Sequence, residues 1–143
     1  MYLICDIDGT LSVEPIGRRV AALYEDWDRY YSMDFSLDAP RPGIVNMVNS
    51  LIESGWIAFF VTNRRDTVRD ETWSWIRRHV PNATAANATL VMRKCDDFTD
   101  PSWWKVDSVR RVCPKASAGL VIDDDHHACL ELGKMGYTVL EVM

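Results

Sequence analysis

The sequence predicts an α/β protein built on a doubly wound parallel sheet, and two observations lead to this prediction. Short apolar runs alternate with helical segments along most of the 143 residues, an order that favours parallel strands with helices on both faces. The apolar runs are nearly continuous, as expected for strands that are covered on both faces. A chain of this length is expected to form a single domain over residues 1–143 that folds without disulfides or a structural metal.

The strands and helices are expected to alternate as follows. Each expected strand is a short apolar run, and the expected strands span residues 2–5, 56–61, 90–92, 120–122 and 137–142. The clearest helix runs from Ile44 to Glu53, where apolar residues form one broad stripe, and Gly55 ends it. The other expected helices span residues 66–79, 103–112 and 126–135.

Residues 12–42 have a mixed character and need not belong to the sheet. Apolar and aromatic residues between Val20 and Tyr31 recur at helical spacing, which predicts a helix there. We expect the segment, about residues 12–42, to form a small cap or flap over one end of the sheet.

The composition limits the kinds of function. The formal net charge of −5 provides no general surface for polyanions, so tight non-specific binding of nucleic acid is not expected, although clustered arginines permit a local basic patch. The four cysteines match neither a zinc pattern nor a compact disulfide framework. We expect them to be reduced in a cytoplasmic protein, in the host cytoplasm if the gene is of phage origin. Neither a signal peptide nor a membrane-spanning run is expected.

Polar side chains follow three of the expected strands. In an open parallel sheet, ligands bind beyond the carboxyl ends of the strands, so these side chains are expected to meet at one edge. Lys105, just inside the helix before the fourth strand, is expected to join them. The residues are Asp6 and Asp8 after the first strand, Thr62, Asn63 and Arg64 after the second, and Asp123, Asp124 and Asp125 after the fourth.

These residue types indicate phosphate chemistry assisted by a divalent cation. Carboxylates gathered this closely repel one another and require a cation, and hard oxygen ligands select Mg²⁺ over softer metals. A metal held in this way keeps open positions for phosphate oxygens, to which Thr62 can donate and whose charge Lys105 can neutralise. An aspartate is also a competent nucleophile toward phosphorus, through an aspartyl-phosphate.

Four short motifs resemble, in order, the four signatures of the haloacid-dehalogenase-like (HAD-like) phosphohydrolases. "DIDGTL" at 6–11 resembles the first signature and "FFVTNR" at 59–64 the second. Lys105 is placed like the third, and "LVIDDD" at 120–125 resembles the fourth. The resemblance covers nearly the whole chain and implies a HAD-like, Rossmannoid fold.

Longer segments are similar to the phage-type phosphatase domain of polynucleotide kinase/3′-phosphatase proteins. These segments are "DWDRYYSMDFSLDAPRPGIVNMVNSLIESGW", "VTNRRDTVRDETWSWIRRH" and "LVMRKCDDFTD". Asn63 stands where that family usually has glycine, a departure that other HAD-like phosphatases share. The sequence contains no GxxxxGK(S/T) loop, so no kinase domain is expected.

The resemblance implies a role for most residues of the cluster. Asp6 is implied as the nucleophile, and Asp8 as the acid that protonates the leaving oxygen and then activates water. Thr62 and Lys105 are implied to hold the transferring phosphoryl group. The implied Mg²⁺ ligands are Asp6, the backbone carbonyl of Asp8, and Asp123 or Asp124; Arg18, Asn63 and Arg64 are expected to contact the substrate.

Plainer alternatives stay open for several residues. Thr62 can be the N-cap of the following helix, and Lys94 is the rival of Lys105 for the catalytic place. Asp125 is expected to cap the next helix rather than to bind metal. The aromatic residues of segment 12–42 are expected to pack, with base stacking as an alternative; they are Trp27, Tyr30 and Tyr31.

The sequence therefore predicts a Mg²⁺-dependent phosphomonoesterase that acts through an aspartyl-phosphate on the 3′-phosphates of polynucleotide ends. The expected partner is the phosphorylated substrate, a nucleic-acid 3′ end or a nucleotide, with no partner protein evident. One alternative is a small-molecule phosphatase such as a 5′-nucleotidase, which the negative net charge mildly favours. The alternative from another class is a non-catalytic binding module, against which the intact acidic cluster speaks.

Overall fold

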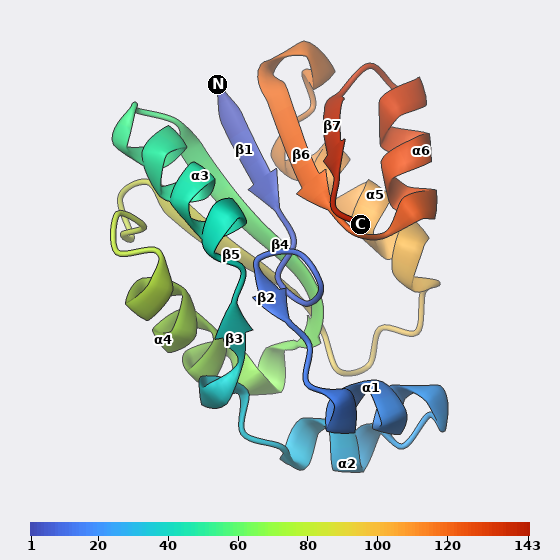
Figure 1. Ribbon diagram of the computed structural model, residues 1–143. Helices are drawn as coiled ribbons and strands as arrows, with labels where there is room; N and C mark the ends of the chain where they lie inside the picture. Colours follow the sequence, from blue (N-terminus) through green and yellow to red (C-terminus); the bar gives the residue numbers. More distant parts are fainter.

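The computed structural model describes residues 1–143 and confirms the α/β class. Five strands form one sheet in the order β5-β4-β1-β6-β7 (Figure 1). Every neighbouring pair in this sheet is parallel. The strands are β1 (Tyr2–Cys5), β4 (Ile57–Arg65), β5 (Ala88–Arg93), β6 (Gly119–Asp123) and β7 (Thr138–Glu141).

Helices cover both faces of the sheet (Figure 1). Leu3 and Cys5 of β1 belong to the apolar cluster of one face, and Ile4 belongs to that of the other, because successive side chains of a strand point to opposite faces. This is the doubly wound arrangement that the apolar runs predict. The helices are α3 (Pro42–Glu53) and α4 (Arg69–His79) on the first face, and α5 (Pro101–Val112) and α6 (His126–Lys134) on the second.

The register of the central strand β1 brings the carboxyl ends of three strands together. Cys5 lies level with Phe60 of β4 and with Ile122 of β6. The backbone N–H of Asp6 continues the pairing and donates to the Ile122 carbonyl at 2.9 Å. The polar residues that follow these positions therefore emerge at one edge of the sheet, next to α1 and α2 in Figure 1.

Segment 12–42 forms a small unit at this edge. A two-residue strand β2 (Ser12–Val13) pairs antiparallel with β3 (Ala39–Pro40), where the segment leaves and rejoins the core. Between them lie α1 (Ile16–Leu23), α2 (Trp27–Ser32) and a short 3₁₀ helix, η1 (Phe35–Leu37).

Three elements differ from the expected ones. The prediction of one helix between Val20 and Tyr31 is wrong, because the chain turns at Glu25, where φ is 54°, and Asp26 starts α2 by accepting from the Arg29 N–H at 3.2 Å. β4 continues to residue 65 rather than ending at 61. The expected helix at 66–79 begins with a 3₁₀ turn, η2 (Asp66–Val68), before α4.

None of the helices combines the length and the apolar character that a bilayer crossing requires. All four cysteines are free thiols: Cys5, Cys113 and Cys129 are buried, and Cys95 is exposed.

Candidate active site

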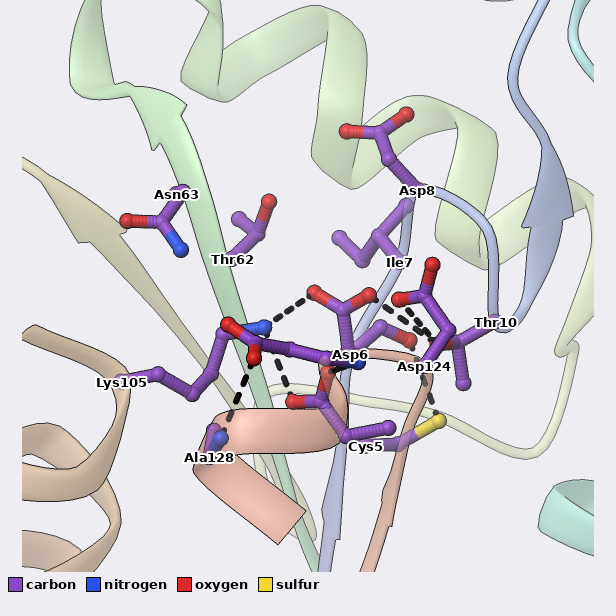
Figure 2. A network of polar contacts seen from close by, with 12 residues as sticks. Cys5, Asp6, Ile7, Asp8, Thr10, Thr62, Asn63, Lys105, Asp124 and Ala128 are labelled. Atoms are coloured by element: carbon purple, nitrogen blue, oxygen red, sulfur yellow. Dashed lines mark hydrogen bonds and ion pairs between the residues drawn. The ribbon is translucent and has the colours of Figure 1, made fainter. Parts of the chain in front are cut away.

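A buried lysine bridges two acids at the carboxyl edge of the sheet. Asp6 follows β1, Asp123 ends β6, and both are buried. Lys105 reaches them from α5, with its Nζ 2.6 Å from Asp6 Oδ1 and 2.9 Å from Asp123 Oδ2 (Figure 2). The rival Lys94 lines the same cleft and makes no ion pair. Of the two lysines, it is Lys105, from within α5, that contacts the acids.

A third carboxylate, Asp124, lies beside the two that bond to this ammonium group. Atoms of Asp6, Asp123 and Asp124 lie within 4.8 Å of one another. Burial raises the pKa of Asp6 well above its ordinary value; Lys105 opposes this shift, and Asp123 adds to it. Burial alone would lower the pKa of Lys105, but the charges of Asp123 and Asp6 raise it, so the lysine stays charged. One positive charge among three carboxylates leaves negative charge that a cation would offset.

The donor set of this cluster fits a hard divalent cation such as Mg²⁺. All three side chains offer carboxylate oxygen, the ligand type that Mg²⁺ takes in proteins. Thr10 holds two of them in place: its hydroxyl lies 3.0 Å from Asp6 Oδ2 and 3.1 Å from Asp124 Oδ1. The side chain of Asp8 does not join the cluster, and in Figure 2 its carboxylate points away from Lys105. Metal binding by the backbone carbonyl of Asp8 stays a prediction.

Gly9 permits the close approach of Asp124. Its φ is +83°, and a Cβ at this position would lie 2.2 Å from Asp124 Oδ2. No side chain fits there without moving the carboxylate. The glycine and threonine of "DIDGTL" thus serve the cluster directly, a role that sequence reasoning missed.

Asp125 is held away from the cluster, as expected for a helix cap. Its Oδ1 accepts from the Ala128 N–H at 3.1 Å at the start of α6, and its Oδ2 accepts from the Ser102 hydroxyl at 2.7 Å. Its own N–H donates to Asp123 Oδ1 at 3.0 Å. Asp125 therefore fixes Asp123 and joins the N-termini of α5 and α6.

The end of β4 carries Thr62 and Asn63. Thr62 is buried beside the site, and its hydroxyl accepts from the Arg64 N–H at 3.1 Å. The N-cap alternative for Thr62 is wrong, because the strand continues through Arg65 before the next helix begins. Asn63 lies against α5: its amide donates to the Pro101 carbonyl at 3.3 Å and accepts from Arg93 at 3.0 Å.

The pairing of β4 with β5 is irregular at this point. Thr62 pairs with Met92, but the next paired residue of β4 is Arg65, so Asn63 and Arg64 bulge out of the ladder. Bulges of this kind redirect side chains beside functional sites. Here the bulge turns Arg64 toward Asp8: its Nε and Nη2 lie 2.8 Å from Asp8 Oδ2 and Oδ1.

Arg18 and Asp38 complete a group of four charges in which Asp8 is partly buried and the other three, including Arg64, are buried. Arg18 Nη2 lies 3.2 Å from Asp8 Oδ1, and both arginines also bond to Asp38. Burial raises the pKa of Asp8, but the charge and hydrogen bonds of Arg64, and then those of Arg18, bring it below the ordinary value. Asp38 was missed, because no local sequence pattern marks it as a partner of residues 20 and 26 positions away.

A cleft of about 540 Å³ lies over these groups. Its floor includes Asp6, Thr62 and Lys105, and Arg64 also lines it, whereas Arg18 does not. The rim carries aromatic residues on two sides: Trp27 of α2, and Phe98 of the loop between β5 and α5. Phe98 is 86% exposed.

This combination of fold and site defines a phosphatase of the HAD-like class. Acids lie at the carboxyl ends of the central strand and β6, a hydroxyl lies near the carboxyl end of β4, and a lysine enters from α5. The model of one family, described as the polynucleotide kinase PNKP phosphatase domain, matches residues 1–143, and the chain belongs to that family. The predicted resemblance and the predicted phosphatase class are thereby confirmed.

Several solved structures share this fold. The chain is similar to one in the Pnkp1/Rnl/Hen1 complex (TM-score 0.73, 16% identity, 99% of this chain and 44% of that chain). It is also similar to the class C acid phosphatase from Bacillus anthracis (TM-score 0.64, 12% identity, 98% of this chain and 64% of that chain). A third similar structure is that of the D,D-heptose 1,7-bisphosphate phosphatase from B. bronchiseptica with magnesium and phosphate (TM-score 0.57, 14% identity, 96% of this chain and 78% of that chain).

At such identities the likeness is one of fold, and the chain spans less than half the length of the chain in the Pnkp1 complex. A second structure of that complex, similar at a TM-score of 0.70, is described as an RNA repair complex. No curated protein matches the sequence.

Proposed function

We propose that the protein is a Mg²⁺-dependent phosphomonoesterase that acts through an aspartyl-phosphate and removes 3′-phosphates from polynucleotide ends. One observation carries the proposal. Asp6 lies at the floor of an open cleft, with Lys105 Nζ at 2.6 Å and the carboxylates of Asp123 and Asp124 beside it. A carboxylate in this place can attack a bound ester, because the lysine and a divalent cation offset its charge and that of the phosphate.

In the first half-reaction, an oxygen of Asp6 attacks phosphorus and the bond to the leaving oxygen breaks. Asp8 gives its proton to that oxygen, so the product leaves as an alcohol. An incoming phosphate dianion beside Asp8 favours its protonated form, against the effect of the arginines. Thr62 and Lys105 orient the phosphoryl oxygens. Asp6, Asp123 and Asp124 would hold a Mg²⁺ ion, which would supply neutralisation of the charge on the phosphoryl group.

In the second half-reaction, water hydrolyses the aspartyl-phosphate. Asp8, now ionised, takes a proton from the attacking water. The bond between Asp6 and phosphorus breaks, inorganic phosphate leaves, and Asp6 returns as a carboxylate. The same residue therefore acts first as the acid and then as the base, and its proton is restored at the end of the cycle.

The rim of the cleft supports a polynucleotide as the substrate. Trp27 and Phe98 present exposed aromatic surface on which a base can stack. Arg65 and Lys94 on the same rim can contact phosphates of a strand. The family to which the chain belongs is described as the phosphatase domain of the polynucleotide kinase PNKP, which favours a polynucleotide substrate, and the similar chain of the RNA repair complex favours RNA ends as one class of substrate.

A small-molecule phosphatase is the second candidate. The net charge of −5 and the acids on the rim favour it, since both repel a polyanion; these acids are Glu14, Glu25, Asp97 and Asp100.

The proposal also extends to a reducing compartment such as the cytoplasm, which the free thiol state of the four cysteines supports.

A comparison of substrates tests the proposal. We expect a 3′-phosphorylated oligonucleotide to be hydrolysed with a kcat/KM at least about tenfold above that of a nucleoside monophosphate, since strand contacts add binding energy. EDTA is expected to abolish both activities, and Mg²⁺ to restore them. A preference for the nucleotide would favour the second candidate. Trapping of phosphate on Asp6, detected by mass spectrometry and lost in Asp6→Asn, tests the covalent step.

A further inference from the structure

The group of four charges formed by Asp8 and the three buried residues Arg18, Asp38 and Arg64 joins two parts of the chain. Asp8 and Arg64 come from the core, whereas Arg18 of α1 and Asp38 come from segment 12–42. On the basis of the proposed function, we propose that Asp38 is a positioning residue. It fixes both arginines and, through them, orients the carboxylate of Asp8 for proton transfer to the leaving oxygen.

Asp38 makes the closest contacts within the group. Its two oxygens bind Arg18 in a bidentate manner, with Arg18 Nη1 at 2.8 Å from Oδ1 and Nη2 against Oδ2. Oδ2 also accepts from Arg64 Nη2 at 3.0 Å. A bidentate pair of this kind fixes the plane of a guanidinium group as well as its position. Asp38 therefore determines which N–H groups remain for Asp8.

The arginines depend on Asp38 in different degrees. Arg18 Nε is buried without a hydrogen-bond partner, and apart from Asp38 its only polar contact is the single 3.2 Å bond to Asp8. Arg64 has further support, because its Nη1 lies 3.1 Å from the Thr72 hydroxyl. Removal of the Asp38 carboxylate would therefore release Arg18 first.

Asp38 is itself held rigidly. Its backbone carbonyl accepts from the indole N–H of Trp75 at 2.9 Å, and its side chain is fully buried. The ring of Phe35 lies under both guanidinium groups, with centroid distances of 4.1 Å to Arg18 and 4.5 Å to Arg64. This support gives the group one arrangement, as proton transfer from a single carboxylate requires.

Loss of the Asp38 carboxylate leaves Asp8 alone between two buried guanidinium groups. Arg18, without its bidentate partner, can turn its paired N–H groups onto Asp8 and rotate that carboxylate away from the cleft. A proton donor must lie within hydrogen-bond reach of the oxygen that it protonates. The defect is therefore expected in the step that needs the proton and not in the attack by Asp6.

Two leaving groups separate these steps in the Asp38→Asn variant. Nitrophenolate departs from p-nitrophenyl phosphate without a proton, whereas the alkoxide of benzyl phosphate needs one. The value of kcat/KM reports on the steps up to and including departure of the leaving group. We expect kcat/KM to fall for benzyl phosphate by at least about tenfold more than for p-nitrophenyl phosphate. Equal losses, or no loss, would show that Asp38 is only structural.

Control variants distinguish this inference from the proposed function. Asp8→Asn is expected to show the same selectivity to a larger degree; if it does not, the acid role of Asp8 fails. If Asp8→Asn is selective and Asp38→Asn is not, only the inference about Asp38 fails. Asp34→Asn, an exposed acid of the same segment that bonds to the Ser36 N–H, is expected to behave as the wild type.

A second variant applies if Asp38→Asn does not fold, as judged by near-ultraviolet circular dichroism and thermal melting. The double variant Arg18→Met/Asp38→Leu replaces the ion pair as a unit by apolar side chains, a change that buried pairs often tolerate. The same selective loss with benzyl phosphate is expected, here because Asp8 loses its bond to Arg18 and Arg64 loses its bond to Asp38. Equal losses with both substrates would overturn the inference.

Discussion

Gly9 and Asp124 approach each other so closely that a Cβ on residue 9 would lie 2.2 Å from the Asp124 carboxylate. The turn that follows the first strand and the acid that follows β6 are therefore fitted to each other, although 115 positions separate them in the sequence. This relationship leads to the first of four predictions.

Gly9→Ala is expected to displace Asp124 and to weaken the metal cluster. Changes beside metal ligands typically cost 10–100-fold in affinity or activity, so the Mg²⁺ concentration for half-maximal activity should rise by roughly tenfold or more. A titration of phosphatase activity with Mg²⁺ measures this. Gly55→Ala is the matched control, because φ there is +95° but no atom lies within 4 Å of the added Cβ. It should lose stability without a change in the Mg²⁺ requirement.

Lys105→Met is expected to destabilise the fold in the absence of metal. Asp6 and Asp123 would remain buried without their ammonium partner, and breaking such a buried pair costs about 3–5 kcal/mol. Urea unfolding, with and without Mg²⁺, measures the change, and Mg²⁺ should restore part of the loss. Lys134→Met removes an exposed pair with Glu131 and should cost less than about 1 kcal/mol. Equal effects of the two variants would contradict this account of the site.

Phe98→Ala is expected to lower the preference for polynucleotides. Stacking of one base on an aromatic side chain is worth about 1–3 kcal/mol, so the ratio of kcat/KM for a 3′-phosphorylated oligonucleotide to that for p-nitrophenyl phosphate should fall at least about fivefold. The control is Leu37→Ala, which removes an equally exposed apolar side chain that does not line the cleft. An unchanged ratio in Phe98→Ala would remove the stacking role.

The ion pairs of Asp8 predict a pH dependence of stability. Arg64 and Arg18 hold the pKa of Asp8 below its ordinary value of 3.8. The unfolded chain therefore binds the proton more readily, and the contribution of Asp8 is present above pH 3.8 and is lost as the pH falls through the folded pKa. The difference in unfolding free energy between the wild type and Asp8→Asn, measured in urea without metal, should shrink as the pH falls below 4. A constant difference would exclude these ion pairs as its source.

The sheet and the place of the site could be predicted from the sequence because both follow from local patterns. Apolar runs mark the strands, and the rule that parallel strands end at one edge brings Asp6, Asp123 and Asp124 together before any contact is known. Lys105 lies in a helix, and its place in the site follows from the resemblance to the third HAD-like signature. The motif "DIDGTL" strengthens the prediction of the site, because its residues are close in the sequence and depend on a single strand and turn.

The remaining features depend on contacts that local patterns do not encode. Asp38 is an acid near a proline, and only the fold brings it to Arg18 and Arg64. The bulge at Asn63 follows from the register between β4 and β5. The turn at Glu25 interrupts apolar spacing that continues on both sides, because the Asp26 cap prevails over periodicity.

The sharing of charges between the core and segment 12–42 has a kinetic consequence. Movement of the segment away from the core would separate both of its ion pairs with the core in a largely buried environment, which is energetically costly. We therefore expect the segment to stay in place as a fixed wall. Under the proposed function, turnover would then need no opening or closing step, and a strand terminus would enter and depart sideways through the open cleft, even while the rest of the strand is held by another macromolecule.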